Sequence, residues 1–185
     1  MDEDKIEALF KEILKELGVE ENTEVFKNTP KRIARSYKEI FAGIDGGNEP
    51  HITLFKNQGY NDILSIKDIP FYSMCEHHLL PFFGTVSIAY IPGNSILGLS
   101  KFPRITRFFA AKPQVQERLT KEIADFISEK VEAKGVLVVI KARHMCMEMR
   151  GVKSGNAETR SSAIRGVLKE SRETREEALK LLLED

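Results

Sequence analysis

Apolar residues recur at helical spacing near the start of the chain, which predicts two amphipathic helices. The first is expected over about residues 3–17, followed by Gly18 as a stop signal. The second is expected to begin at the Thr29–Pro30 pair, a cap and first-turn signal, and to end near Gly43. Its first turns are basic, which is typical of a solvated face and also compatible with an anionic ligand.

The glycine-rich stretch Gly43–Pro50 is expected to be a loop. It divides the chain into an N-terminal helical appendage, residues 1–48, and a main domain, residues 49–185. Beyond this loop, apolar and polar residues alternate with the period of two that is typical of strands. The predicted strands are HITLF, DILSIKDIP and GTVSIAYIP, with proline closing the last two.

Two further helices are predicted after these strands. Ser100 is the expected cap of a short helix that carries Lys101, Arg104 and Arg107, so its N-terminus and these cations would form an anion site. Pro113 is expected to start a longer helix with an apolar stripe.

The run GVLVVIKARHMCMEMRGV predicts one long strand, in which alternation would put His144, Cys146 and Arg150 on one face. The segment from about Glu158 to Leu168 is compatible with a strand or a loop, and Ser171 is the expected cap of a terminal helix. This order of elements predicts an α+β fold with a mostly antiparallel sheet.

Composition narrows the classes of function. The 28 basic and 28 acidic residues give zero net charge, which argues against a general attraction to nucleic acid or to an anionic membrane. No apolar run reaches transmembrane length, and the acidic N-terminus lacks the pattern of a secretory signal, so we expect a cytoplasmic protein. In such a reducing compartment two cysteines near histidines are more often metal ligands than a disulfide, although a disulfide stays open.

Both cysteines and three of the four histidines fall in two short patches, as Cys75, His77, His78, His144 and Cys146. Thiolate and imidazole are the ligands that zinc prefers. Cys75, Cys146 and one histidine of the pair His77 and His78 would give three ligands, and the spacing does not decide between the two. Three ligands leave an open position where zinc activates water, and the other histidines would transfer protons. With the cationic helix, this predicts hydrolysis of a phosphorylated substrate; a purely structural metal is the alternative.

The motifs CEHHLLPFFG, SIAYIP, ILGLSKFPR, PQVQERLT and HMCMEMRGV, in this order and spacing, resemble the GTP cyclohydrolase I family from about Thr29 to the C-terminus. The resemblance implies conversion of GTP and water to formate and 7,8-dihydroneopterin triphosphate, the first step of folate and pterin biosynthesis. It also implies the tunnelling fold, an antiparallel four-stranded sheet with two helices on one face, here preceded by N-terminal helices. Members assemble as homodecamers with active sites between subunits.

The resemblance also assigns roles to residues. One zinc ion per subunit would be held by Cys75, His78 and Cys146. His77 would protonate the guanine at N7, and His144 would act as the acid that opens the ribose. Ser100 is given a catalytic and a substrate-binding role in the substrate loop. The other substrate-binding residues would be the triphosphate ligands Lys101, Arg104 and Arg150 and the guanine-reading pair Gln116 and Glu117.

Some residues depart from the family pattern. Arg160 and Arg165 stand where many relatives carry Val or Leu, and the stretch SGNAETRSS is not a close match, which leaves the local structure after Gly151 open. Two alternative functions are a tunnelling-fold relative acting on another purine or deazapurine through a cysteine nucleophile, and a non-catalytic zinc-binding module. The full ligand set disfavours the first, and the two histidines that are not ligands disfavour the second.

Overall fold

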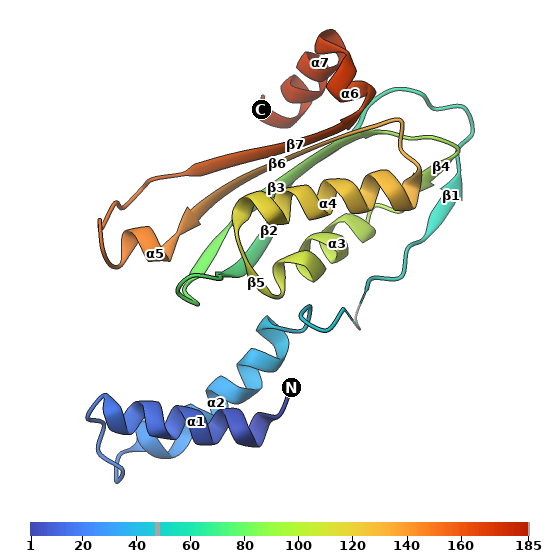
Figure 1. Cartoon of the computed structure of the whole chain (residues 1–185). Coiled ribbons are helices and arrows are strands. Elements are labelled where there is room, and N and C mark those ends of the chain that lie inside the picture. Colours follow the sequence, from blue (N-terminus) through green and yellow to red (C-terminus); the bar gives the residue numbers. More distant parts are fainter. Residues whose placement is uncertain (47–48, 185) are drawn as a thin grey trace.

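The computed structural model describes residues 1–46 and 49–184. A twisted antiparallel sheet with helices on both faces forms the main body, and two N-terminal helices lie apart from it (Figure 1). The predicted α+β fold is therefore confirmed. Within the described residues no helix is both long and apolar enough to cross a membrane.

The N-terminal helices α1 (Glu3–Glu16) and α2 (Glu24–Ile40) pack against each other as a hairpin. The prediction for α1 is confirmed, but the predicted start of α2 at Thr29 is wrong. Thr23 caps α2 instead, because its hydroxyl accepts a hydrogen bond from the Phe26 amide at 3.2 Å. Pro30 consequently lies inside the helix, where its ring is buried on the same side as Ala34.

The hairpin joins the main body at Gly43. The Gly43 amide donates a hydrogen bond to the Ala111 carbonyl at 2.8 Å, and a Cβ atom on Gly43 would lie 2.5 Å from the Phe108 carbonyl oxygen. Any larger residue would push the two parts of the chain apart. The predicted boundary at residue 48 falls outside the described residues, so the division into residues 1–48 and 49–185 stays a prediction.

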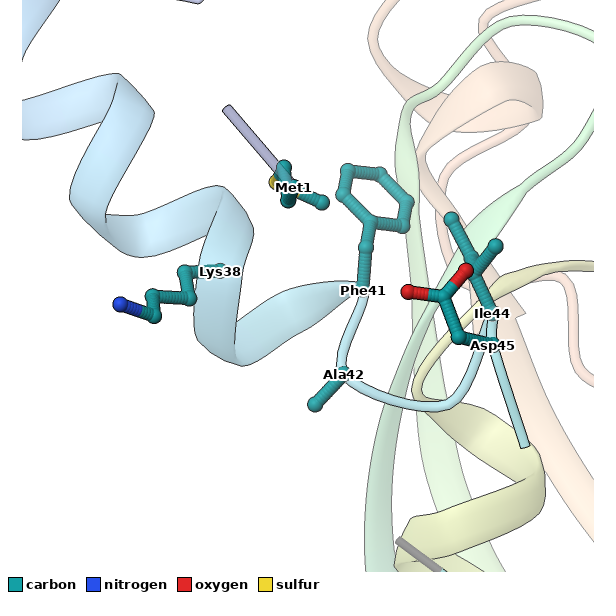
Figure 2. A pocket seen from close by; sticks show the side chains of 6 residues that line it. All are labelled: Met1, Lys38, Phe41, Ala42, Ile44 and Asp45. Carbon is teal, nitrogen blue, oxygen red and sulfur yellow. The ribbon is translucent and has the colours of Figure 1, made fainter. Parts of the chain in front are cut away.

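A hollow of about 380 Å³ lies at the end of α2, beside the start of the chain (Figure 2). Met1, Lys38, Phe41, Ala42, Ile44 and Asp45 line it. None of the predicted site residues is among them, and the Lys38 ammonium is already paired with Glu3 at 2.8 Å. The hollow is therefore separate from the candidate active site.

The sheet has the strand order β5-β2-β3-β6-β7. Its four long strands are mutually antiparallel: β2 (Leu64–Cys75), β3 (Pro81–Ile91), β6 (Gly135–His144) and β7 (Thr159–Gly166). The short β5 (Pro113–Gln114) pairs in parallel with the end of β2, and β1 (Leu54–Lys56) pairs separately with β4 (Ser95–Leu97). The four-stranded antiparallel sheet is confirmed, and the ambiguous segment after Glu158 forms β7.

Proline 70 does not close the second strand, contrary to the prediction. It lies within β2 opposite Thr85. Among the described residues β5 pairs with β2 only at Met74 and Cys75, so Pro70 sits where β2 is the edge strand. Its missing N–H therefore costs no ladder hydrogen bond there, and the strand continues to Cys75.

Helices α3 (Lys101–Ala110) and α4 (Gln116–Val131) cover one face of the sheet. Buried apolar side chains of these helices and of the sheet form one core. The helices contribute Ile105, Leu119, Ile123 and Ile127, and the sheet contributes Phe71, Val86, Ile88, Val138 and Ile140. This confirms two helices on one face. The predicted helix start at Pro113 is wrong, because Pro113 and Gln114 pair with β2 as β5 and the helix begins at Gln116.

Helices α6 (Val167–Glu170) and α7 (Arg172–Leu183) cover part of the other face, where Leu168, Ala178 and Leu182 pack on Ala89 and Leu137. The predicted cap of the terminal helix is confirmed, since the Ser171 hydroxyl accepts a hydrogen bond from the Thr174 amide at 3.2 Å.

The prediction of one long strand through HMCMEMRG is wrong in its second half. Strand β6 ends at His144, and the chain continues as one helical turn, α5 (Met145–Glu148). Strand β6 loses its pairing partner at this point. His144 pairs with Phe82, and the antiparallel strand β3 begins at Pro81, only one residue before Phe82. Strand alternation therefore does not place Cys146 and Arg150 relative to His144.

Candidate metal centre and active site

Three side chains with metal-binding atoms converge where β2 and β6 end. The thiols of Cys75 and Cys146 and a ring nitrogen of His78 all lie within 4.8 Å of one another. Both cysteines are free thiols, so the alternative of a Cys75–Cys146 disulfide is not what the structure contains. Two thiols and an imidazole are a donor set that suits zinc, and three protein ligands leave a fourth position open.

The turn after β2 brings His78 back to Cys75. The Cys75 carbonyl accepts hydrogen bonds from the amides of His78 at 3.4 Å and Leu79 at 2.8 Å, and Leu79 has the left-handed backbone that closes such a turn (φ 49°). Cys146 comes from α5, far along the sequence. The turn after β2 and the helical turn α5 thus supply the ligands from two distant parts of the chain.

His77 and His78 differ in their surroundings, although both approach Cys75. The Cys75 thiol lies 3.6 Å from Nδ1 of His77 and 4.0 Å from Nδ1 of His78. Only His78 joins the group that also contains Cys146. The His77 side chain is largely exposed, and its Nε2 lies 3.9 Å from the Glu76 carboxylate. It is therefore accessible to a bound molecule.

Burial raises the pKa of the Cys146 thiol, and the neighbouring Cys75 adds to this effect. Ionisation of Cys146 beside a second thiol is disfavoured because two negative charges this close would repel. A cation bound between them would reverse that preference, since a coordinated thiol loses its proton.

His144 is half-buried and held on two sides. Its ring stacks on Phe82 with centroids 4.9 Å apart and planes 4° apart, and its Nε2 lies 2.9 Å from Oε1 of Gln116. Burial lowers the pKa of His144, against the opposing influence of the carboxylates of Glu117 and Glu148. The neutral imidazole is thereby favoured.

The first turn of α4 borders the same site. Gln116 is buried with only 1% of its surface exposed, whereas Glu117 is exposed. Arg118 donates a hydrogen bond to Glu76 and so ties the turn after β2 to α4. Sequence reasoning missed this contact, although Arg118 stands within the QERLT motif.

Arg150 also lies at this end of the sheet, with its Nη1 3.0 Å from Nε2 of His78. It is exposed. The predicted association of Arg150 with the metal-ligand group is therefore seen, although α5 and not strand alternation creates it.

The residues predicted to form the substrate loop lie away from the metal ligands in the structure. The N-terminal end of α3 carries Ser100, Lys101 and Arg104. The C-terminal end of α3 lies near the metal ligands, because the Ser73 hydroxyl, two residues before Cys75, donates to the Ala110 carbonyl at 2.7 Å. Ten helical residues span about 15 Å. Within one chain the structure thus separates these residues from Cys75.

Ser100 stands at the N-cap position of α3, but the predicted cap is wrong. Its backbone is already helical (φ −64°, ψ −10°), and among the described residues its side chain makes no capping hydrogen bond.

The chain matches the family model described as GTP cyclohydrolase I over residues 6–183, which extends the match upstream of Thr29. It is 48% identical to GTP cyclohydrolase 1 of Carboxydothermus hydrogenoformans, covering 98% of this chain and 95% of the relative. It is 46% identical to that of Thermoanaerobacter pseudethanolicus and 45% identical to that of Clostridioides difficile, covering 98% of this chain and 97% of each relative. The chain therefore belongs to the GTP cyclohydrolase I family.

Proposed function

We propose that this chain holds one zinc ion through Cys75, His78 and Cys146 and uses it, with His77 and His144, to open the guanine ring of GTP. As a member of the GTP cyclohydrolase I family, the chain converts GTP and water to formate and 7,8-dihydroneopterin triphosphate. The observation that carries the residue assignment is the convergence of two thiol sulfurs and one imidazole nitrogen within 4.8 Å of one another. When bound, the zinc supplies an activated water.

The two remaining histidines are suited to moving protons. His77 is exposed on the turn that carries His78, which supports its role in protonating N7 of the guanine. His144 is half-buried with its ring held by Phe82 and Gln116, and an imidazole is suited to taking and giving a proton near neutral pH, which supports its role in ribose opening.

Glu117 is our candidate for reading guanine. Its carboxylate is exposed close to His144, and a carboxylate can accept hydrogen bonds from the N1–H and the 2-amino group together. Gln116 stays a predicted second member of this pair, although its side chain already has partners within the chain. Arg150 is exposed beside the site and is our candidate for the triphosphate.

The separation of Ser100, Lys101 and Arg104 from the metal ligands supports active sites shared between subunits. A second copy of the chain would have to supply these three residues for one GTP to meet both groups. This favours a homo-oligomer, and the homodecamer that the resemblance implies stays a prediction. The cytoplasmic location and the division into a helical appendage and a catalytic domain also stay predictions.

The test is an assay of the purified, zinc-loaded protein with GTP. We expect release of formate together with a pterin that becomes fluorescent after oxidation. Metal content should be measured in the same preparation. Full zinc loading without any formate would contradict the proposal and favour the non-catalytic zinc-binding module.

A further inference from the structure

We infer that Gln116 is a positioning residue that holds His144 with its proton on Nε2, so that Nδ1 is the ring nitrogen that exchanges protons with the substrate. This rests on the proposed role of His144 in the reaction. It goes further by naming the reacting atom and the residue that selects it.

The orientation of the Gln116 amide is fixed by two carbonyl groups. Its Nε2 lies 3.2 Å from the Ile140 carbonyl oxygen and 3.1 Å from the Thr159 carbonyl oxygen. Carbonyl oxygens only accept hydrogen bonds, so the amide nitrogen must face them. The opposite orientation would put the amide oxygen against two carbonyl oxygens, within a buried site where an unpaired polar group is costly. The Gln116 oxygen therefore faces His144.

A chain of hydroxyl groups reinforces this orientation. Thr120 Oγ1 donates to the main-chain oxygen of Gln116 at 2.7 Å, which uses its only proton. Ser161 Oγ, 2.7 Å from Thr120 Oγ1, must then be the donor in that pair, so it faces Gln116 Nε2 at 3.0 Å as an acceptor, and the two amide protons are shared among three acceptors. Every hydroxyl proton is thus assigned, and each step points the amide the same way.

The Gln116 oxygen in turn selects the tautomer of His144. An amide oxygen accepts hydrogen bonds, so the His144 Nε2 at 2.9 Å must carry the proton. The stacking of the ring on fully buried Phe82 holds its plane. Because an amide oxygen does not accept a proton outright near neutral pH, protons enter and leave His144 through Nδ1.

The proton balance follows. When the ribose C1′–O4′ bond breaks, O4′ takes the bonding electrons and the Nδ1 proton, the lone pair of the nitrogen attached to C1′ forms a C1′=N bond, and the ring remains as the neutral Nε2–H form. In the rearrangement that follows, the proton lost from C2′ returns to the same ring nitrogen. Gln116 keeps its hydrogen bond in both states.

Kinetics of Gln116→Met separate this role from guanine reading. We expect kcat to fall about 10- to 100-fold, less than the roughly 10²- to 10⁴-fold effect of a general acid itself, with little change in KM for GTP. In a His144→Ala background the same substitution should cost nothing more, because it acts through His144. A raised KM with unchanged kcat, or an equal further loss in that background, would overturn the inference.

Gln114→Met is the matched control. Gln114 is as buried as Gln116, but its amide donates to the Phe109 carbonyl at 3.1 Å and to Glu122 at 2.7 Å, away from His144. The Gln114→Met variant should lose about as much stability as Gln116→Met and keep its kcat. If both variants lose kcat equally, the loss in Gln116→Met comes from impaired folding. If Gln116→Met does not fold, Ser161→Ala removes one partner of the amide and should give a smaller loss of the same kind.

A readout independent of turnover completes the test. Solid-state ¹⁵N NMR of histidine-labelled, zinc-loaded protein, with His144→Ala identifying the signals, should show His144 with its proton on Nε2, and Gln116→Met should weaken that preference. A wild-type Nδ1–H form would refute the inference. If the wild type does not turn over GTP, the proposed function fails, while the spectrum still decides the role of Gln116.

Discussion

At the scale of single residues, side chains of the same type in the candidate site differ mainly in their surroundings. Cys75 and Cys146 face each other without forming a disulfide, and His78 is the histidine that shares their space. His77 is largely exposed, and His144 is half-buried against Phe82 and Gln116. The surroundings of the three imidazoles therefore differ, which supports the roles we propose for them: ligand, exposed proton donor and oriented acid.

This division predicts opposite results for two substitutions. Cys146→Ser should weaken zinc binding by more than ~100-fold, beyond the cost of losing a residue that only orients a ligand. His144→Ala should retain the metal but lower kcat by about 10²- to 10⁴-fold. Metal analysis after dialysis, combined with the formate assay, checks both. Zinc loss in His144→Ala would show that it is a ligand.

At the scale of elements, the ends of strands and helices bring the site together. Strand β2 ends in the turn that carries His78, β6 ends in α5 with Cys146, and α4 begins with Gln116 and Glu117. Arg143, the last residue but one of β6, donates from Nε to Glu148 at 2.9 Å and so closes α5 against the strand. The ends of these elements thus bring three short segments to the same site.

Strand β7 is also linked to α4 by Arg165, one of the two arginines that depart from the family pattern. Arg165 Nε donates to Asp125 at 2.6 Å, with both side chains 30% exposed. Burial opposes ionisation of Asp125, but hydrogen bonds from Arg165 and Lys121 outweigh it, so the pKa of Asp125 is lowered. Arg160 instead pairs with Glu158 in the open.

We therefore expect Arg165→Met to destabilise the fold by about 1 kcal/mol, and Arg160→Met by less, as is usual for exposed pairs. The folded-state pKa of Asp125 is lowered, so its stabilising effect is present above the unfolded-state pKa and is lost as the pH falls through the folded-state pKa. Thermal unfolding should show a difference between wild type and Arg165→Met at pH 7 that shrinks in acid. A difference that does not depend on pH would contradict this.

At the scale of the whole molecule, the two groups of residues that we propose for one site lie at opposite ends of α3. The metal ligands and Glu117 lie toward the C-terminal end of α3, and Ser100, Lys101 and Arg104 lie at the other. Assembly of copies of the chain is the simplest way to bring unlike halves together.

Mixing inactive variants tests this arrangement. Co-expression of His144→Ala with the Lys101→Ala/Arg104→Ala double variant should restore up to about a quarter of the wild-type activity if each site draws on two chains at random. Co-expression of His144→Ala with His77→Ala is the control: both defects lie in the same half-site, so activity should not return. Equal activity in the two mixtures would mean that one chain builds the whole site.

Several helices, strands and caps of this protein could be predicted from its sequence. The helix of residues 3–17, the alternation in GTVSIAYIP and the Ser171 cap are local signals, because the chemistry that creates them lies within a few residues. The candidate metal ligands were predictable in part, since Cys and His are rare and their clustering in two patches is visible without a fold, whereas the choice of His78 over His77 came from the family resemblance.

Only the tertiary structure decided where strands stop and which polar groups meet. β6 ends at His144 because β3 runs out opposite it, and Pro113 starts no helix because β2 offers a partner. The bonds from Gln116 to Ile140, Thr159 and His144 join segments far apart in the chain. The sequence determined the chemistry that was available, and long-range pairing determined which atom of His144 is left to react.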